Sequence, residues 1–182
     1  FMDQSGGGVT FSGGEPLMQA EFLHEALTLL AGSGIHTAVD TSGYVQPESL
    51  RHIVNVTSLF LYDIKHIDSE EHKKYTGVTN ELIISNLDML LDHGADVILR
   101  IPVIPGITTG ERYMEKLRGF IERRRTENLR EINLLPYHKT GSSKYSRFEL
   151  PDRMEGVGAL SNGHLDDYIE LLRVTGIPVR KG

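Results

Sequence analysis

The residues best suited to chemistry in this sequence are charged or imidazole side chains that follow short apolar runs. Glu15, Asp40, Asp63, Lys65 and His138 each lie just past the end of a predicted strand, and four different strands contribute them. Ligands of parallel α/β folds bind at the carboxyl ends of the strands. Singly, each residue has an ordinary structural role open to it, such as a turn cap or a surface ion pair. Together they favour one binding site.

A glycine-rich run, GGGVTFSGGEP at residues 6–16, precedes the first of these carboxylates. Gly13 and Gly14 have no Cβ, so a ligand can lie directly on the backbone there, and Glu15 can accept a hydrogen bond from a ligand ammonium group. A phosphate site is the main alternative, because glycine-rich turns that lead into helices bind anions. The two common phosphate-binding glycine patterns are absent, however, and a carboxylate would repel phosphate. The run therefore predicts a cationic or zwitterionic ligand.

The elements that must position these residues alternate between strand and helix. Strands are predicted at residues 9–11, 35–39, 59–62, 97–101, 132–135 and 177–180, and helices at 19–31, 47–54, 82–91, 111–125 and 165–174. This alternation predicts a parallel sheet, and periodicity alone fits both an open sheet and a βα barrel. The apolar run 59–62 is typical of a strand covered on both faces. A turn is predicted at 102–106, and a long loop, able to serve function, at 139–164.

Composition predicts an ordinary globular protein. The chain has 182 residues and a formal net charge of −6, which suits one domain over residues 1–182 and argues against a nucleic-acid partner. No apolar run is long enough to span a membrane, and we expect a cytoplasmic protein. The basic run 123–125 is interpreted as a solvated helix end. The sequence contains no cysteine, which excludes disulfides and thiolate metal ligands within it.

Five segments in order resemble the radical S-adenosylmethionine (radical SAM) enzymes that activate glycyl radical enzymes, such as the activating enzymes of pyruvate formate-lyase. The segments are SGGGVTFSGGEPLMQAEF, GIHTAVDTSGY, LYDIKH, LRIPVIPG and INLLPYH, and they cover nearly the whole chain. The resemblance implies an α/β fold of the partial parallel βα barrel type (TIM-like). Ser42 departs from the asparagine that is common in the family, and we expect it to be tolerated.

The resemblance also implies roles for individual residues. Gly13, Gly14 and Glu15 would hold the methionine amino group of S-adenosylmethionine (SAM), and Arg100 would face SAM or the incoming peptide. The remaining implied SAM-binding residues are Asp40, Asp63, Ile64 and Lys65 near the methionyl and ribose end, and His138 near the ribose and adenine. Asp40 and Thr41 would also form a small-cation site.

The chemistry that the resemblance implies needs a reduced [4Fe–4S] iron–sulfur cluster, which cleaves SAM to a 5′-deoxyadenosyl radical. That radical takes a hydrogen from the Cα of one glycine in the partner, which is pyruvate formate-lyase or another glycyl radical enzyme. The electron donor would be flavodoxin or ferredoxin. The cofactor carries the difficult chemistry, and the protein orients it.

The missing cysteines leave three hypotheses open. The family holds its cluster with C-x-x-x-C-x-x-C upstream of the glycine run. The start at Phe1-Met2 favours a piece of an activating enzyme that lacks its first βα unit and is inactive alone. The second hypothesis is a cluster-less module that docks a glycyl radical enzyme through residues 139–164. The third is an unrelated βα-barrel enzyme that binds a phosphorylated small molecule through Lys65 or Arg100.

Overall fold

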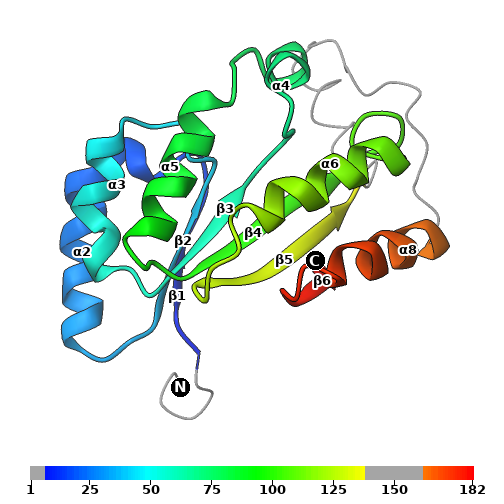
Figure 1. The fold of residues 1–182 in the computed structure, drawn as a ribbon. Coiled ribbons are helices and arrows are strands. Elements are labelled where there is room, and N and C mark those ends of the chain that lie inside the picture. The colour runs from blue at the N-terminus through cyan, green and yellow to red at the C-terminus, as the bar shows by residue number, and fades with distance from the viewer. Residues whose placement is uncertain (1–6, 138–161) are drawn as a thin grey trace, which may run out of the picture.

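Six parallel strands form one sheet whose spatial order follows the chain (Figure 1). The computed structural model describes residues 7–137 and 162–182. The strands are β1 (Val9–Phe11), β2 (Thr37–Thr41), β3 (Leu59–Asp63), β4 (Val97–Val103), β5 (Leu129–Pro136) and β6 (Val179–Lys181). Within the described part of the chain, β1 and β6 lie at the two edges and each pairs with one neighbour. The fold is therefore a partial parallel βα barrel, as the sequence predicts.

The helices connect consecutive strands, and Figure 1 shows α2, α3, α5 and α6 on the same side of the sheet. The α-helices are α2 (Ala20–Gly32), α3 (Pro47–Ile53), α4 (Ser69–Thr76), α5 (Glu81–Asp92), α6 (Glu111–Glu122) and α8 (Asn162–Arg173), and the short 3-10 helices are η1 (Pro16–Gln19) and η2 (Val54–Val56). Crossovers of this kind place the helices against the sheet, where their apolar faces bury its side chains. The core thus lies between the sheet and these helices.

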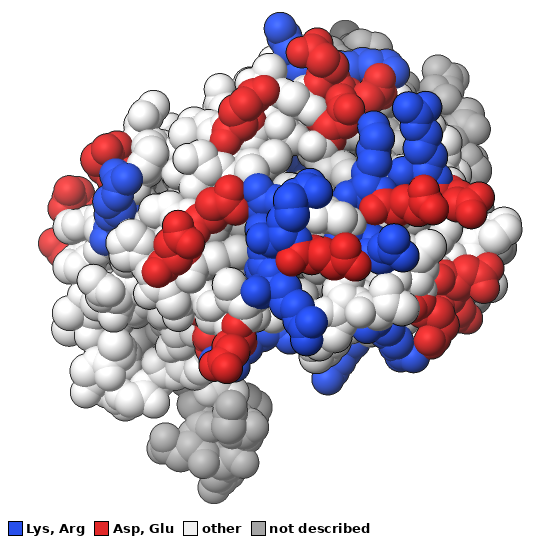
Figure 2. Space-filling view, in the orientation of Figure 1, with Lys and Arg blue, Asp and Glu red and all other residues white. Residues whose placement is uncertain are grey.

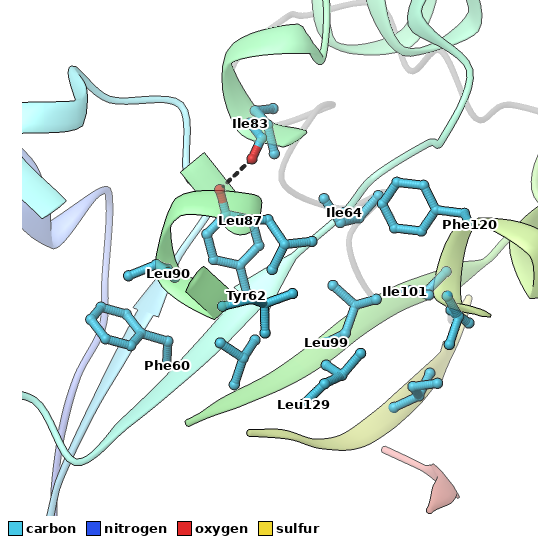
Figure 3. Packing of buried hydrophobic residues seen from close by; sticks show 14 of the residues in the cluster. Phe60, Tyr62, Ile64, Ile83, Leu87, Leu90, Leu99, Ile101, Phe120 and Leu129 are labelled. Atoms are coloured by element: carbon cyan, nitrogen blue, oxygen red, sulfur yellow. Dashed lines mark hydrogen bonds between the residues drawn. The ribbon is translucent and has the colours of Figure 1, made fainter. Parts of the chain in front are cut away.

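The strands alternate between a buried face and a half-buried face. In β4, every second residue from Val97 to Val103 is buried, whereas Ile98 and Arg100 are only partly covered. In β3, Phe60 and Tyr62 are buried in the core of Figure 3, whereas Leu59 and Leu61 are not fully buried. The prediction that residues 59–62 are covered on both faces is therefore wrong. Helices pack on one face, and the other face carries the polar residues of the candidate site.

Helix α4 is absent from the sequence-based prediction because it has almost no apolar residues. His72 is its buried residue, and the periodic apolar pattern that marks α2 or α5 is missing. The cap residues carry the signal instead: the Asp68 carboxylate accepts a hydrogen bond from the Glu71 N–H, and Gly77 ends the helix with a φ of 91°. These caps explain why a polar segment is helical.

Strand β4 continues through Pro102 and Val103, where the sequence predicts a turn. The Pro102 carbonyl accepts a hydrogen bond of 2.6 Å from the Thr108 hydroxyl, and Pro102 lies opposite Leu135 of β5. The predicted loop 139–164 falls mostly on residues 138–161, outside the described part of the chain. Its last three residues belong to α8, which begins at Asn162.

The outer helical face carries charges of both signs, interspersed, as Figure 2 shows. Arg124 pairs with Asp88 through both carboxylate oxygens, at 2.6 and 3.0 Å, and its guanidinium lies 4.0 Å from the centroid of the Phe120 ring. The basic run at 123–125 is therefore more than a solvated helix end, since Arg124 joins α5 to α6. In the described residues, no helix has the length and apolar character needed to cross a membrane.

Candidate functional site

The register of the sheet brings the charged residues of β2, β3 and β4 together. Asp63 lies directly opposite Arg100 on the neighbouring strand, and both side chains lie on the half-buried face. The Arg100 Nη1 atom is 2.8 Å from Asp40 Oδ2, and its Nε atom is 3.1 Å from Asp63 Oδ1. The Lys65 ammonium is 2.6 Å from Asp63 Oδ2. One arginine therefore joins the carboxylates of two strands.

This network leaves one carboxylate oxygen incompletely satisfied. Asp63 Oδ1 is buried and forms no hydrogen bond of acceptable geometry with the described residues, although the Arg100 Nε atom is in ion-pair range. Buried polar atoms without a hydrogen bond are rare, because the lost solvation is not repaid. The ion pair with Arg100 is therefore what compensates the charge on this oxygen among the described residues.

The Glu15 carboxylate is held by four donors from its own chain. Its Oε1 atom accepts hydrogen bonds from the Leu17 N–H at 3.4 Å and the Thr41 hydroxyl at 2.8 Å. Its Oε2 atom accepts from the Ser42 N–H at 3.0 Å and the Ser42 hydroxyl at 2.7 Å. Four donors match the four lone-pair positions of a carboxylate. Glu15 thus links the turn after β1 to the turn after β2.

The turn after β2 is also held from the helical side. The Asn86 amide on α5 donates hydrogen bonds of 2.9 Å to the carbonyls of both Gly43 and Val45. The Tyr62 hydroxyl, seen in Figure 3, donates to the Ile83 carbonyl at 2.6 Å. Burial, followed by the nearby Glu15 carboxylate, raises the pKa of Tyr62 far above its usual value, so the phenol stays neutral. These contacts make the turn a rigid support for Glu15.

The charged residues and the glycine turn surround one cavity of about 400 Å³. Its lining residues are Gly13, Gly14, Glu15, Asp40, Ser42, Asp63, Lys65 and Arg100. A Cβ atom built on either Gly13 or Gly14 would meet no other atom within 4 Å, so the turn is open above the backbone. Three carboxylates face two cations among these residues, which gives the lining a net negative charge. The size lies within the range of small-molecule sites.

One predicted site residue, Ile64, is not among the residues that line this cavity, and another lies outside the described part of the chain. The Ile64 side chain is 1% exposed and packs in the core with Phe120 and Ile101 in Figure 3. Only the Ile64 backbone is therefore left for a role in the site, because its side chain points into the core. His138 lies outside the described residues.

The predicted small-cation site at Asp40 and Thr41 stays a prediction. The Thr41 hydroxyl donates to Glu15 and accepts from the Gly43 N–H, and Asp40 is paired with Arg100. In the described ranges, no group of three or more histidine, cysteine or acidic side chains is arranged to hold a metal ion.

Sequence reasoning missed three polar residues that shape the site: Ser12, Ser42 and Asn86. The Ser12 hydroxyl lies 3.3 Å from Asp40 Oδ2, and Ser42 supplies two of the four donors to Glu15. Ser42 directly follows Asp40 and Thr41 in the segment GIHTAVDTSGY, so its position was available from the sequence. Asn86 lies within an apolar helix and became informative only when the fold placed it beside Gly43.

The lining residues fit SAM and do not fit an iron–sulfur cluster. A cavity with excess carboxylate and an open glycine backbone suits a ligand with an ammonium and a sulfonium group. A [4Fe–4S] cluster needs thiolate ligands, and the sequence contains no cysteine.

Comparison with known proteins identifies relatives for most of this chain. The sequence model of the Radical SAM superfamily matches residues 3–117. The choline trimethylamine-lyase activating enzyme of Oleidesulfovibrio alaskensis is 42% identical over 183 residues, which covers 98% of this chain and 58% of that protein. The 4-hydroxyphenylacetate decarboxylase activating enzyme of Clostridioides difficile is 40% identical, which covers 96% of this chain and 55% of that protein. The chain thus spans a little over half the length of these curated relatives.

A solved structure of similar extent is a domain of a pyruvate-formate lyase-activating enzyme from Bacteroides vulgatus. It superposes with a TM-score of 0.77 at 31% sequence identity, and the match covers 97% of this chain and 99% of that domain. The likeness therefore extends over nearly the whole chain.

Proposed function

The chain belongs to the family of radical SAM enzymes that activate glycyl radical enzymes, and we propose that it forms the part of such an enzyme that binds SAM. The observation that carries the proposal is the cavity on the Gly13-Gly14-Glu15 turn, with its excess of carboxylates. When bound, SAM is the source of the 5′-deoxyadenosyl radical in this family. The residues of this chain would bind and orient it.

The proposed binding mode follows from the charges of the cavity. The turn at Gly13 and Gly14 lets the methionine end approach the backbone, and the carboxylates of Asp40 and Asp63 favour its ammonium and sulfonium groups. The Arg100 guanidinium, paired with both carboxylates, is available to the ligand carboxylate. Glu15 both adds negative charge and fixes the turn after β2, through Thr41 and Ser42.

The whole protein that contains this part would activate a partner enzyme by placing a radical on one of its glycines. The relatives named above act on a choline trimethylamine-lyase and on a 4-hydroxyphenylacetate decarboxylase. We propose a glycyl radical enzyme as partner, with pyruvate formate-lyase as one candidate, and flavodoxin or ferredoxin as electron donor. This chain by itself has no thiolate for the cluster, and we expect no turnover from it.

Calorimetric titration of SAM and of S-adenosylhomocysteine into the chain tests the binding proposal. We expect SAM to bind more tightly, because its sulfonium charge faces an excess of carboxylates. Replacing Glu15 by Gln removes a charge from the cavity and a firm acceptor from Ser42. Both changes act on SAM indirectly, through the charge of the cavity and the position of the turn, and we expect the affinity to fall roughly 10- to 100-fold in Glu15→Gln, which corresponds to about 1.4–2.8 kcal/mol.

The matched control is Glu21→Gln on α2, where the side chain is 93% exposed and lies outside the cavity lining. Its affinity for SAM should equal that of the unchanged chain. Equal SAM affinity in Glu15→Gln and the unchanged chain would contradict the assigned role of Glu15.

A second candidate function is a docking module without radical chemistry, which would need no cysteine. This module would bind a glycyl radical enzyme whether or not SAM is present. Titration with purified pyruvate formate-lyase, with and without SAM, separates the two proposals. Binding of the enzyme by a chain that binds no SAM would favour docking.

A further inference from the structure

Among the three acids that line the cavity, Glu15 is the one whose donors are all uncharged. Asp40 pairs with Arg100, and Asp63 is within ion-pair range of two cations, Arg100 and Lys65. Glu15 instead accepts from two backbone N–H groups and two hydroxyls of the described residues. An ammonium donor adds the attraction of opposite charges to its hydrogen bond, which an uncharged donor does not. Glu15 is therefore the carboxylate that gains most when a cation replaces one of its donors.

Three of the four donors to Glu15 are fixed in place. The N–H groups of Leu17 and Ser42 belong to the backbone. The third donor is the Thr41 hydroxyl, from a residue that is 2% exposed, and its oxygen accepts from the Gly43 N–H at 3.0 Å. Thr41 is also β-branched, which restricts its χ1 angle. None of these three donors can leave without moving the main chain or a buried side chain.

The Ser42 hydroxyl is the donor that can leave. Ser42 lines the cavity beside Glu15 and is only half-buried, and its hydroxyl lies 2.7 Å from Glu15 Oε2. A serine hydroxyl rotates readily toward a new partner. Because the residue is half-buried, the released hydroxyl can bond to water, so no buried group is left unpaired. A cation in the cavity therefore competes with this one hydroxyl for its place on Glu15.

We propose that the Ser42 hydroxyl occupies the position on Glu15 that a ligand ammonium takes, and that it leaves Glu15 when SAM binds. The inference rests on the proposed function, since it takes SAM to be the ligand. It adds a direct contact of Glu15 to the indirect effects described above. The Ser42 N–H stays on the same oxygen and keeps Glu15 in place. The hydroxyl is thus an internal competitor, which lowers the affinity for SAM and favours ligands whose donor is strong enough to replace it.

Calorimetric titration of the full chain with two ligands tests this exchange. The ligands are S-adenosylhomocysteine and an analogue of it in which hydrogen replaces the amino group. We expect Ser42→Ala to bind S-adenosylhomocysteine about three- to tenfold more tightly than the unchanged chain does, the range that one net hydrogen bond gives. The analogue should bind both proteins equally, because it has no ammonium to replace the hydroxyl.

Two results of these titrations would overturn the proposal. The first is equal or weaker binding of S-adenosylhomocysteine by Ser42→Ala. The second is an equal gain for both ligands, because the gain would then come from the space that alanine opens and not from the ammonium.

Stability separates this role of Ser42 from a purely structural one. Without ligand, Ser42→Ala should unfold at a lower urea concentration than the unchanged chain, because Glu15 loses a donor. Its affinity for S-adenosylhomocysteine should nevertheless rise. A serine that only supports the turn would lower both the stability and the affinity when replaced, and that result would also contradict the exchange.

The matched control is Ser33→Ala at the end of α2. The Ser33 hydroxyl donates to the Leu29 carbonyl at 3.0 Å, and the residue lies outside the cavity lining. This variant should bind S-adenosylhomocysteine as the unchanged chain does, and circular dichroism checks that both variants are folded. If neither the unchanged chain nor the control binds this ligand, the proposed function is wrong. If both bind it and Ser42→Ala gains nothing, only the exchange is wrong.

Discussion

Replacing Gly43 by alanine should cost more stability than the same change at other glycines with positive φ. Gly43 has a φ of 69°, and a Cβ atom there would lie 1.8 Å from the Tyr62 hydroxyl oxygen and 2.2 Å from the ring carbon that carries it. Real Cβ atoms do not approach so closely, so the turn or the buried ring must move. Gly94 is the matched control, because its φ is 75° and a Cβ atom would meet nothing within 4 Å.

The two glycines separate the backbone cost from the packing cost. A residue with a Cβ atom in the left-handed region lowers the free energy of unfolding by about 1–2 kcal/mol. Alanine offsets this by about 0.4–1 kcal/mol, because it restricts the unfolded chain more than glycine does. Gly94→Ala should therefore lower the free energy of unfolding by about 1 kcal/mol. Gly43→Ala adds the cost of overpacking, typically about 1–3 kcal/mol. The total expected for Gly43→Ala is about 2–4 kcal/mol.

Urea unfolding followed by circular dichroism measures both values on one scale. A functional measurement accompanies it, because movement of the turn at Gly43 displaces Ser42 from Glu15. SAM should therefore bind more weakly to Gly43→Ala and unchanged to Gly94→Ala, at temperatures where both are folded. If the two variants lose the same stability, within about 0.5 kcal/mol, the close contact between Gly43 and Tyr62 does not constrain the turn.

Two other changes test the contacts that hold the turn after β2. Asn86→Ala leaves the carbonyls of Gly43 and Val45 without their buried donor, and it should lower the free energy of unfolding by about 2–4 kcal/mol, measured in urea. A loss below about 0.5 kcal/mol would show that water replaces the amide. Because burial raises the pKa of Tyr62 above its unfolded value near 10, the stability from its neutral phenol is complete below about pH 10 and declines as pH rises further. Unfolding midpoints at pH 9 and 10.5 should show a smaller decline in Tyr62→Phe, and an equal decline in both proteins would contradict this assignment.

The sequence by itself determined the parallel α/β class and most of the residues that meet at the cavity. Apolar runs that alternate with amphipathic helices allow little else than a parallel sheet, and Asp63 follows such a run directly. The carboxyl ends of parallel strands share one edge, so polar residues at those positions were expected to converge. Glu15 was marked by the glycines before it, because a backbone without side chains lets a ligand approach closely.

Only the tertiary structure decided which partners these residues have. Sequence position gave no sign that Arg100 pairs with carboxylates on two other strands, because that pairing depends on register. Nor did it show that Thr41 and Ser42, which lie 26 and 27 residues away, supply three of the four donors to Glu15.

The open or closed form of the sheet and the single face covered by helices likewise depend on how distant segments pack. Local sequence patterns report the periodicity of one element, whereas ion pairs, cavities and unmet hydrogen bonds arise between elements. The type and order of the elements could therefore be predicted from the sequence, while the electrostatics of the site required the fold.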